Sequence, residues 1–239
     1  MRNAEFLLQA ARRPENGRLV RTWRAGQRGP AGYLEDYAAL GLGLLDLYQT
    51  DPDPQWFTAA EDLAVAMTAL FEDPAGGFFD TGSDGERLIV RPKDVQDNAT
   101  PCGNSLAAQF LLQLFAYTGD GRSYDLAQRA LSPIHPVSLQ HPTAFANWLC
   151  AMDFAVGPVR EVAIVGSDSP ARDALLDILR RTYRPRLVTA TAKRGDPPPP
   201  LLAGRTSIDG APTAYVCERF VCLQPTTDPG ELERQLGER

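Results

Sequence analysis

The sequence predicts a mainly helical chain that ends in a small α/β module. Two observations predict this fold class. Helical periodicity recurs in pairs of segments, at residues 34–71 and 104–131, with a long loop between the pairs. After Gly157 the pattern changes to short β-branched runs on either side of one helix. We therefore expect an α/α portion over residues 1–157 and an α/β module over residues 158–239.

The α/α portion opens with a short helix over residues 5–13 and a strand-like hairpin over residues 17–26, where apolar and polar side chains alternate. A helix is predicted over residues 34–49, because apolar side chains recur there every three or four positions. The sequence DPDP at residues 51–54 ends it, since proline cannot continue a helix. A second helix is expected over residues 55–71.

A long loop separates this pair of helices from the next. It contains a glycine-rich turn at residues 72–81, a strand-like run (RLIVR) at 87–91 and a polar segment at 92–103. Three further helices are expected at residues 104–119, 123–131 and 143–157. Solenoid repeats have short loops at a fixed period, whereas long loops at one end of a helical scaffold usually carry binding groups. The arrangement therefore favours an α/α toroid.

The α/β module is predicted from a buried strand, a helix and a second strand in sequence. The β-branched run at residues 161–167 is the first strand, and Ser169 caps the helix that follows. Two strands joined by a helix indicate a parallel crossover. The remaining elements are a second strand at 186–191, a proline-rich linker at 195–200, a strand–turn–strand or one bent strand at 213–224, and a terminal helix capped by Asp228.

Composition excludes several classes of partner. The 239 residues include 24 Lys and Arg against 30 Asp and Glu, a formal net charge of −6, which argues against a nucleic-acid partner. No apolar run reaches the roughly 18 residues of a membrane span, and the N-terminus does not resemble a signal peptide. We therefore expect a cytoplasmic protein that does not enter membranes.

Motif searches indicate chemistry without a cofactor. The sequence contains no P-loop, no G-x-G-x-x-G, no G-x-S-x-G and no H-E-x-x-H motif. Its two histidines, His135 and His141, flank a proline-containing stretch. We expect no metal, nucleotide or other cofactor, and any reaction would depend on carboxylates, basic groups, amides, aromatic rings or thiols.

Six segments together resemble one known family. They are GRLVRTWRAG, YLEDYAALGLGLLDLYQ, GGFFDT, RPKDVQDNATPCGNSLAA, MDFAVGPVREVAIVG and PTAYVCERFVCLQPTTDPGEL. The chain resembles the C-terminal portion of the thioredoxin-domain-containing, spermatogenesis-associated family and its bacterial relatives. This resemblance implies a six-hairpin (α/α)6 toroid, similar to six-hairpin glycosidases and to N-acylglucosamine and cellobiose 2-epimerases. It also implies that an N-terminal thioredoxin-like domain is absent here, and that about half of a twelve-helix ring is present.

The sequence departs from these patterns in two places. The family motif Pro-Ser-Gly-Asn-Ser reads Pro-Cys-Gly-Asn-Ser at residues 101–105. Toroids of the epimerase type use histidines to move protons, but His135 and His141 lie in a segment that resembles no catalytic histidine motif. Epimerisation by that route is therefore not expected.

Candidate catalytic residues lie at the start of a helix and in the polar loop. Glu35 and Asp36 could act as acid or base at the mouth of a toroid, with Asp36 and Asp97 as the main pair. Alternatively, the first two simply favour the positive end of a helix. The side chains expected to bind a sugar, by hydroxyl contacts or ring stacking, are Tyr37, Trp23, Phe78, Phe79, Arg91, Lys93, Asp94, Asn98 and Asn104. In the alternative reading, Asn104 or Ser105 caps a helix and Arg91 pairs with Asp94.

The four cysteines have separate interpretations. Cys102 begins a helix, where the dipole would lower the pKa of a reactive thiol, although a small packing residue in place of serine is favoured. Cys150 is predicted to be a core residue of an apolar helix. Cys217 and Cys222 could form a disulfide across a hairpin, but reduced packing cysteines are favoured.

Two function hypotheses follow. The first is a carbohydrate-active or carbohydrate-binding toroid that works through carboxylate acid–base groups, with a sugar as substrate. The second is a non-catalytic scaffold or truncated half-protein, completed by a thioredoxin-like partner or by a second copy. Half a ring would leave apolar faces such as Leu40/Leu44 or Leu111/Leu114 without neighbours.

Overall fold

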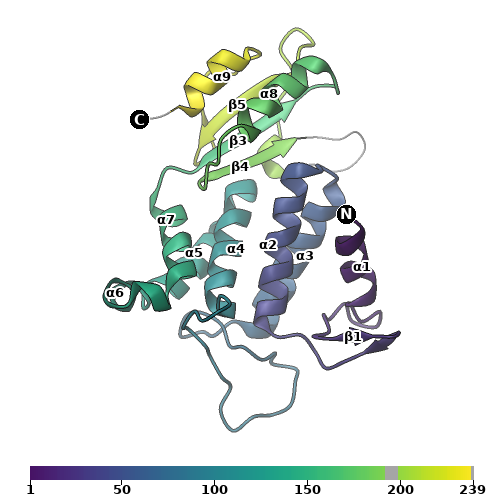
Figure 1. The fold of residues 1–239 in the computed structure, drawn as a ribbon, viewed down its shortest axis with the longest axis vertical. Helices are drawn as coiled ribbons and strands as arrows, with labels where there is room; N and C mark the ends of the chain where they lie inside the picture. Colours follow the sequence, from purple (N-terminus) through teal and green to yellow (C-terminus); the bar gives the residue numbers. More distant parts are fainter. Residues whose placement is uncertain (192–198, 238–239) are drawn as a thin grey trace.

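The computed structural model describes residues 1–191 and 199–237. Its first part is mainly helical and its second part contains a small sheet with two covering helices (Figure 1). The elements of the first part are α1 (Arg2–Ala10), β1 (Trp23–Arg24), β2 (Gln27–Arg28), α2 (Leu34–Thr50), α3 (Pro54–Phe71), α4 (Gly103–Thr118), α5 (Gly121–Leu131), α6 (His135–Gln140), η1 (Pro142–Ala144) and α7 (Ala146–Val156). Those of the second part are β3 (Arg160–Val165), α8 (Pro170–Arg180), β4 (Leu187–Thr191), η2 (Pro200–Leu202), β5 (Thr213–Glu218), β6 (Val221–Cys222) and α9 (Pro229–Leu236).

Helices α2, α4 and α7 lie side by side and run in the same direction, while α3 and α5 return in the opposite direction (Figure 1). All three parallel helices therefore begin at one end of the molecule. The hairpin before α2 and the loops before α4 and α7 lie at that same end, opposite the sheet. The fold thus gathers three helix N-termini and three loops in one region.

Local sequence signals explain where these helices start and stop. Asp53 accepts a hydrogen bond from the Gln55 N–H at 3.1 Å, and Pro54 occupies the first turn of α3. Asp120 caps α5 by accepting bonds from the N–H groups of residues 122 and 123. Gly119 ends α4 at φ 71°, a left-handed conformation that suits glycine. The predicted helices therefore form close to their expected ranges.

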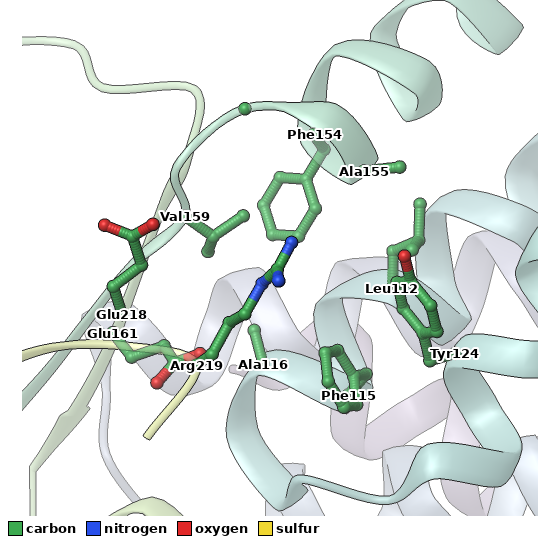
Figure 2. Close-up of a pocket in the computed structure, with 11 residues that line it drawn as sticks. Leu112, Phe115, Ala116, Tyr124, Phe154, Ala155, Val159, Glu161, Glu218 and Arg219 are labelled. Atoms are coloured by element: carbon green, nitrogen blue, oxygen red, sulfur yellow. The ribbon is translucent and has the colours of Figure 1, made fainter. Parts of the chain in front are cut away.

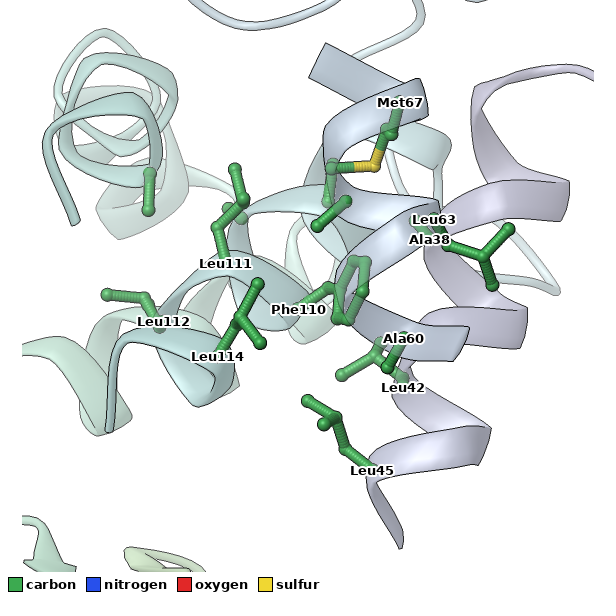
Figure 3. Packing of buried hydrophobic residues seen from close by; sticks show 14 of the residues in the cluster. Ala38, Leu42, Leu45, Ala60, Leu63, Met67, Phe110, Leu111, Leu112 and Leu114 are labelled. Carbon is green, nitrogen blue, oxygen red and sulfur yellow. The ribbon is translucent and has the colours of Figure 1, made fainter. Parts of the chain in front are cut away.

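The helical core depends on a close approach between α2 and α4. Gly41 faces the ring of Phe110, and a Cβ at Gly41 would lie only 2.3 Å from Cζ of that ring. Phe110 is completely buried among apolar side chains of α2 and α3, including Ala38, Leu63 and Met67 (Figure 3). The small residues of α2 thus allow it to pack on several sides at once.

The sheet has the strand order β4-β3-β5-β6. Strands β3 and β4 are parallel, with Val162 opposite Thr189, as the predicted crossover requires. Strand β5 runs antiparallel to both β3 and β6. Ser169 caps α8 and Asp228 caps α9, as predicted.

The two faces of the sheet belong to different apolar clusters. Ala163 and Val165 of β3 join the core of the helical part, together with Val188 and Ala190 of β4. The alternate residues, such as Val162 and Ile164, pack with α8 and α9 on the other face. The sheet is therefore a layer between the helical part and two covering helices.

Helices α2 and α4 also cover the free edge of β4. Tyr48 donates a hydrogen bond to the Thr191 carbonyl at 2.8 Å, and Tyr117 donates one to the Thr189 carbonyl at 3.3 Å. The Thr189 N–H donates to Oε1 of Gln49 at 3.2 Å. These bonds satisfy backbone groups that an edge strand would otherwise leave unpaired.

Several sequence predictions are wrong in detail. The run at residues 87–91 is not a strand; Ile89 and Val90 are fully or largely exposed, because no neighbouring strand pairs with them. A short helix, α6, lies where none was expected. The first helix lies earlier than predicted, at Arg2–Ala10. The predicted linker at residues 195–200 falls largely outside the described residues.

Other corrections concern apolar side chains and cysteines. Leu44, Leu111 and Leu114 are buried within the chain, so they do not lack neighbours, and Leu40 is half-buried. Cys150 is exposed on α7 and is not a core residue. Cys217 and Cys222 lie opposite each other on β5 and β6 and form a disulfide, so the prediction of a reduced pair is wrong.

Among residues 1–191 and 199–237, no helix is long and apolar enough to cross a membrane. Over the same residues, no group of three or more His, Cys, Asp or Glu side chains has a metal-binding arrangement.

Candidate functional site

A cleft of about 470 Å³ opens where α2 and α4 begin. Its walls come from the hairpin before α2, from the first turns of the two helices and from the loop at residues 72–102. The lining residues are Arg21, Tyr33, Glu35, Asp80, Thr81, Leu88, Pro92, Asp94 and Gly103. The cleft thus combines three carboxylates, one guanidinium and one aromatic ring.

Three hydrogen bonds fix Asp80 in this cleft. Its N–H donates to the Pro92 carbonyl at 2.9 Å, and its carbonyl accepts from the Leu34 N–H at 3.0 Å. Its Oδ2 accepts a hydrogen bond from the Asp94 N–H at 2.9 Å. The residue therefore ties the loop both to itself and to the first turn of α2.

The surroundings of Asp80 disfavour its charged form relative to an ordinary aspartate. Burial raises the pKa of this carboxyl, and the negative charges of Asp94 and Glu35 raise it further. The hydrogen bond from the Asp94 N–H and the charge of Lys93 act in the opposite direction, but the pKa remains raised. A carboxyl in this situation is suited to donate a proton.

Glu35 has a different environment from Asp80. Its Oε1 lies 2.6 Å from Nη2 of Arg21, and the same guanidinium lies 3.2 Å from Oδ2 of Asp36. The hydrogen bond to Glu35 is the main cause that raises the pKa of Arg21. Arg21 also lies over the Tyr33 ring, 4.7 Å from its centroid. The cleft therefore contains one ion-paired carboxylate and one carboxyl whose pKa is raised.

Asp36 has a mainly local role. Its Oδ2 accepts a hydrogen bond from the Tyr33 N–H at 2.7 Å, which completes a capping box at the start of α2. Together with the ion pair to Arg21, this contact supports the helix-terminus interpretation of its charge. Asp36 borders a neighbouring groove rather than the cleft.

Asp97 lies apart from the cleft lining and is only 6% exposed. Its Oδ1 accepts hydrogen bonds from the Cys102 N–H at 3.0 Å and from Ser105 Oγ at 2.7 Å. Its Oδ2 accepts from the Asn147 and Trp148 N–H groups at 2.9 and 3.3 Å. One carboxylate thus joins the starts of α4 and α7. The geometry does not support the expected catalytic pair of Asp36 and Asp97, since four donors already occupy Asp97.

Three further candidates hold the loop in place. Asn104 accepts from the Phe78 N–H at 2.7 Å and donates to the carbonyls of Phe78 and Asp94 at 2.8 and 3.0 Å. Arg91 donates to the carbonyls of Leu70 and Thr81. Lys93 forms an ion pair with Asp73 at 2.8 Å and also donates to the Gly76 carbonyl. These side chains shape the wall that carries Asp80 and Asp94. The Arg91–Asp94 pair of the alternative reading is not among the bonds described for Arg91.

The aromatic candidates lie mostly outside the cleft. Phe78 is completely buried, and Phe79 lies beneath the Arg91 guanidinium, 4.1 Å from it. Tyr37 is buried and accepts a hydrogen bond from the Leu19 N–H at 2.9 Å. Trp23 packs against Phe6 with ring centroids 5.1 Å apart. Among the described residues that line the cleft, Tyr33 alone is aromatic, and it was not among the predicted site residues.

Two remaining candidates also fall outside the cleft lining. Asn98 is exposed, and its N–H donates to the Thr100 carbonyl at 3.1 Å. Cys102 is buried at the N-cap of α4, where its Sγ accepts from the Ser105 N–H at 3.4 Å. Burial raises the pKa of the Cys102 thiol, whereas the helix terminus was expected to lower it. The raised pKa favours the packing role.

A second, smaller pocket lies between the β5–β6 turn and helices α4, α5 and α7 (Figure 2). Its walls are mainly apolar, and the Arg219 side chain extends across it toward Phe154. Both of its carboxylates already have partners. Glu161 accepts from the Phe220 N–H at 2.7 Å, and Glu218 pairs with Arg160 at 2.6 Å. The first cleft is therefore the better candidate for acid–base chemistry.

Sequence reasoning found Glu35 and Asp94 but missed Arg21, Tyr33, Asp80 and Thr81. A signal for Asp80 was present, because this aspartate directly follows the glycine-rich turn and its two phenylalanines. Its proximity to Asp94, fourteen positions later, depends on the path of an irregular loop.

Comparison with known proteins gives one consistent result. Spermatogenesis-associated protein 20 of Homo sapiens is 33% identical over 251 aligned residues, which cover 98% of this chain and 32% of the human protein. The mouse protein of that name gives the same values, and an uncharacterised protein of Caenorhabditis elegans is 26% identical over 92% of this chain. The chain spans about a third of the length of these relatives. No protein-family model matches it. The similarity predicted from the six sequence segments is confirmed for these relatives.

Proposed function

We propose that the cleft at the start of α2 and α4 binds a carbohydrate and acts on it through its carboxyl groups. The observation that carries this proposal is the contrast between Asp80 and Glu35 in one cleft. Burial and neighbouring charges raise the pKa of Asp80, whereas Glu35 forms an ion pair with Arg21 at 2.6 Å. Two carboxyl groups in such different environments are what general acid–base chemistry on a glycosidic bond or sugar carbon requires.

Each lining residue has a role in this proposal. Asp80 donates a proton to the leaving or ring oxygen, and Glu35 is the carboxylate that accepts a proton or stabilises positive charge. Arg21 orients Glu35, and Asp94 accepts a hydrogen bond from a sugar hydroxyl. Tyr33, which is 41% exposed, offers a surface for stacking against a sugar ring. These assignments replace the pair of Asp36 and Asp97.

We further propose that the chain forms an arc of an (α/α)6 toroid and belongs with the spermatogenesis-associated relatives. Three parallel helices beside one another, with α3 and α5 returning, support this proposal. The loops at the N-terminal end of those helices, which line the cleft, support it too. A cytoplasmic location remains our proposal on the sequence features given above.

Turnover of a panel of nitrophenyl glycosides tests the catalytic proposal. We expect Asp80→Asn and Glu35→Gln each to lower kcat by about 10²-fold or more, since each removes one proton-transfer group. The exposed residue Glu233 on α9 provides a matched control, and Glu233→Gln should leave kcat unchanged. Turnover that survives both cleft substitutions would contradict the proposal.

A second candidate function is a scaffold that pairs with another copy of this chain. A groove of about 790 Å³ follows the side of α2, with Leu7, Leu40 and Gly43 among its lining residues, and an arc of a ring would present such a side to a neighbour. Sedimentation velocity tests this alternative. A concentration-dependent dimer that Leu40→Glu abolishes would support it, and a monomer at all concentrations would exclude it. If the partner is instead a thioredoxin-like protein, adding such a protein to the chain should give a complex that contains both.

A further inference from the structure

The hairpin of β5 and β6 contains a disulfide beside the half-buried cation of Arg205. Cys217 lies on β5 and is 1% exposed, while Cys222 is half-buried on β6, a two-residue strand at the edge of the sheet. Nη2 of Arg205 lies 3.3 Å from Sγ of Cys217 and 3.2 Å from Sγ of Cys222. A single guanidinium group therefore contacts both sulfur atoms.

Arg205 is held in this position by contacts of its own. Its other terminal nitrogen donates to the Leu201 carbonyl, and its guanidinium lies 5.7 Å from the centroid of the Tyr215 ring. The charge of Glu161 also acts on Arg205, but the Glu161 carboxylate accepts a hydrogen bond from the Phe220 N–H. The positive charge thus remains directed at the sulfur atoms.

Cys222 is the less buried residue of the pair, because it lies on the edge strand β6, whereas Cys217 is 1% exposed. A reductant therefore reaches the disulfide through Cys222.

We propose that Cys217 and Cys222 form a site of thiol–disulfide exchange with a dithiol reductant. The proposal is independent of the function of the cleft. A thiolate of the reductant attacks Sγ of Cys222, the less buried cysteine, and forms a mixed disulfide. The bond between the two cysteines breaks, and Cys217 leaves as a thiolate whose charge Arg205 neutralises.

The second thiol of the reductant completes the exchange. It attacks the reductant sulfur of the mixed disulfide, so that Cys222 leaves as a thiolate and the reductant becomes a disulfide. Two electrons pass to the cysteine pair, and two protons from the reductant thiols balance the reaction. Reduction removes the covalent link between β5 and β6. It thereby frees the Arg219–Phe220 turn, in which both residues have positive φ, 49° and 64°.

Reduction of the native chain by dithiothreitol tests this proposal, with free thiols counted by mass shift after alkylation. We expect the pair to be reduced without unfolding, and Arg205→Met to slow the reaction by about tenfold, because it removes the cation that stabilises the leaving thiolate. Arg205→Lys should restore part of the rate. Arg160→Met is the matched control, since Arg160 pairs with Glu218 beside the disulfide, and its rate should stay within about twofold of wild type.

A variant-free measurement covers the case in which the Arg205 variants do not fold. The rates at which anionic 2-mercaptoethanesulfonate and cationic cysteamine reduce the wild-type chain are compared. Each rate is first divided by the rate of the same thiol on neutral hydroxyethyl disulfide. The normalised rate should be higher for the anionic thiol. A pair that is reduced only after unfolding, or a rate unchanged by Arg205→Met, would overturn the proposal. Equal normalised rates for the two thiols would also overturn it.

Discussion

Asp80 and Asp97 belong to the same irregular loop, yet their surroundings assign them opposite tasks. Asp97 is buried and accepts four hydrogen bonds from the starts of α4 and α7. Asp80 accepts one backbone hydrogen bond and faces two other carboxylates in a cleft. The donors around each side chain, rather than its chemical type, therefore decide which aspartate holds the structure and which can exchange a proton.

Asp80→Asn should stabilise the fold at neutral pH. The folded-state pKa of Asp80 lies above the ordinary value of 3.8, so its ionisation costs stability once the pH rises through the folded pKa. The neutral amide removes this cost, and we expect a gain in unfolding free energy of less than about 1 kcal/mol after screening by solvent. Urea unfolding measured from pH 3 to pH 8 should show the gain at the upper end and its loss toward about pH 3.8. A gain that is equal at all pH values would contradict this explanation.

Asp97→Asn should have the opposite effect on stability. Asparagine offers one acceptor oxygen, and its NH₂ group would face N–H donors that now bind the carboxylate. We expect a loss of about 2–3 kcal/mol in the free energy of unfolding, because hydrogen bonds to a buried charge are strong. Asn98→Ala, at the exposed neighbouring position, should change the free energy of unfolding very little. Equal stability of the Asp97 variant and wild type in urea titration would exclude the capping role.

At the scale of elements, the small residues of α2 determine how closely α4 can approach. Sequence periodicity predicted both helices. The periodicity could not show which glycine makes the contact. Gly41 faces Phe110, whereas Gly43 has no atom within 4 Å of where its Cβ would lie. The two positions differ by two residues in sequence and lie on different faces of the helix.

Gly41→Ala and Gly43→Ala form a matched pair that tests this packing. The new methyl at position 41 would collide with the Phe110 ring, and we expect a loss of about 1–3 kcal/mol in the free energy of unfolding. At position 43 the same change should raise the free energy of unfolding by up to about 1 kcal/mol, because alanine favours the helix. Thermal melts of both variants give the comparison. Similar shifts for the two would show that α2 and α4 are less closely packed than the structure has them.

The loops explain why much of the candidate site could not be predicted. Helices with proline and aspartate signals at their ends, such as α3 and α9, follow from local sequence. The cleft instead depends on hydrogen bonds between residues far apart, such as Asp80 to Leu34 and Asn104 to Phe78. The run at residues 87–91 shows the converse, since its β-branched residues suggested a strand that has no partner in the fold.

At the scale of the whole molecule, the helical part and the sheet share one apolar cluster. Residues of β3, β4 and η2 pack with those of α2 and α4, and Tyr48 and Tyr117 bond to the free edge of β4. A boundary near Gly157 therefore separates two patterns of secondary structure, but contacts extend across it. We expect the described parts of the chain to unfold together.

Tyr48→Phe should test this coupling. It removes the donor to the Thr191 carbonyl and leaves a buried acceptor unpaired, which should cost about 1–2 kcal/mol in the free energy of unfolding. Tyr183→Phe is the control, because that side chain is 88% exposed. Urea unfolding can be followed by tryptophan fluorescence, which reports only on the helical part, and by amide exchange of β3. The transitions seen by the two probes should shift together. Separate midpoints for the two probes would show that the parts are independent.

The central claim is that the cleft at the start of α2 and α4 binds a sugar. The most direct test is a thermal melt of the purified chain with a panel of mono- and disaccharides, because a ligand that binds only the folded state raises the melting temperature. We predict that at least one sugar raises the melting temperature of the wild type and of Glu233→Gln, and that Glu35→Gln and Asp94→Asn abolish the shift. A cooperative melt that no sugar changes, or a shift that survives both cleft substitutions, would contradict the claim.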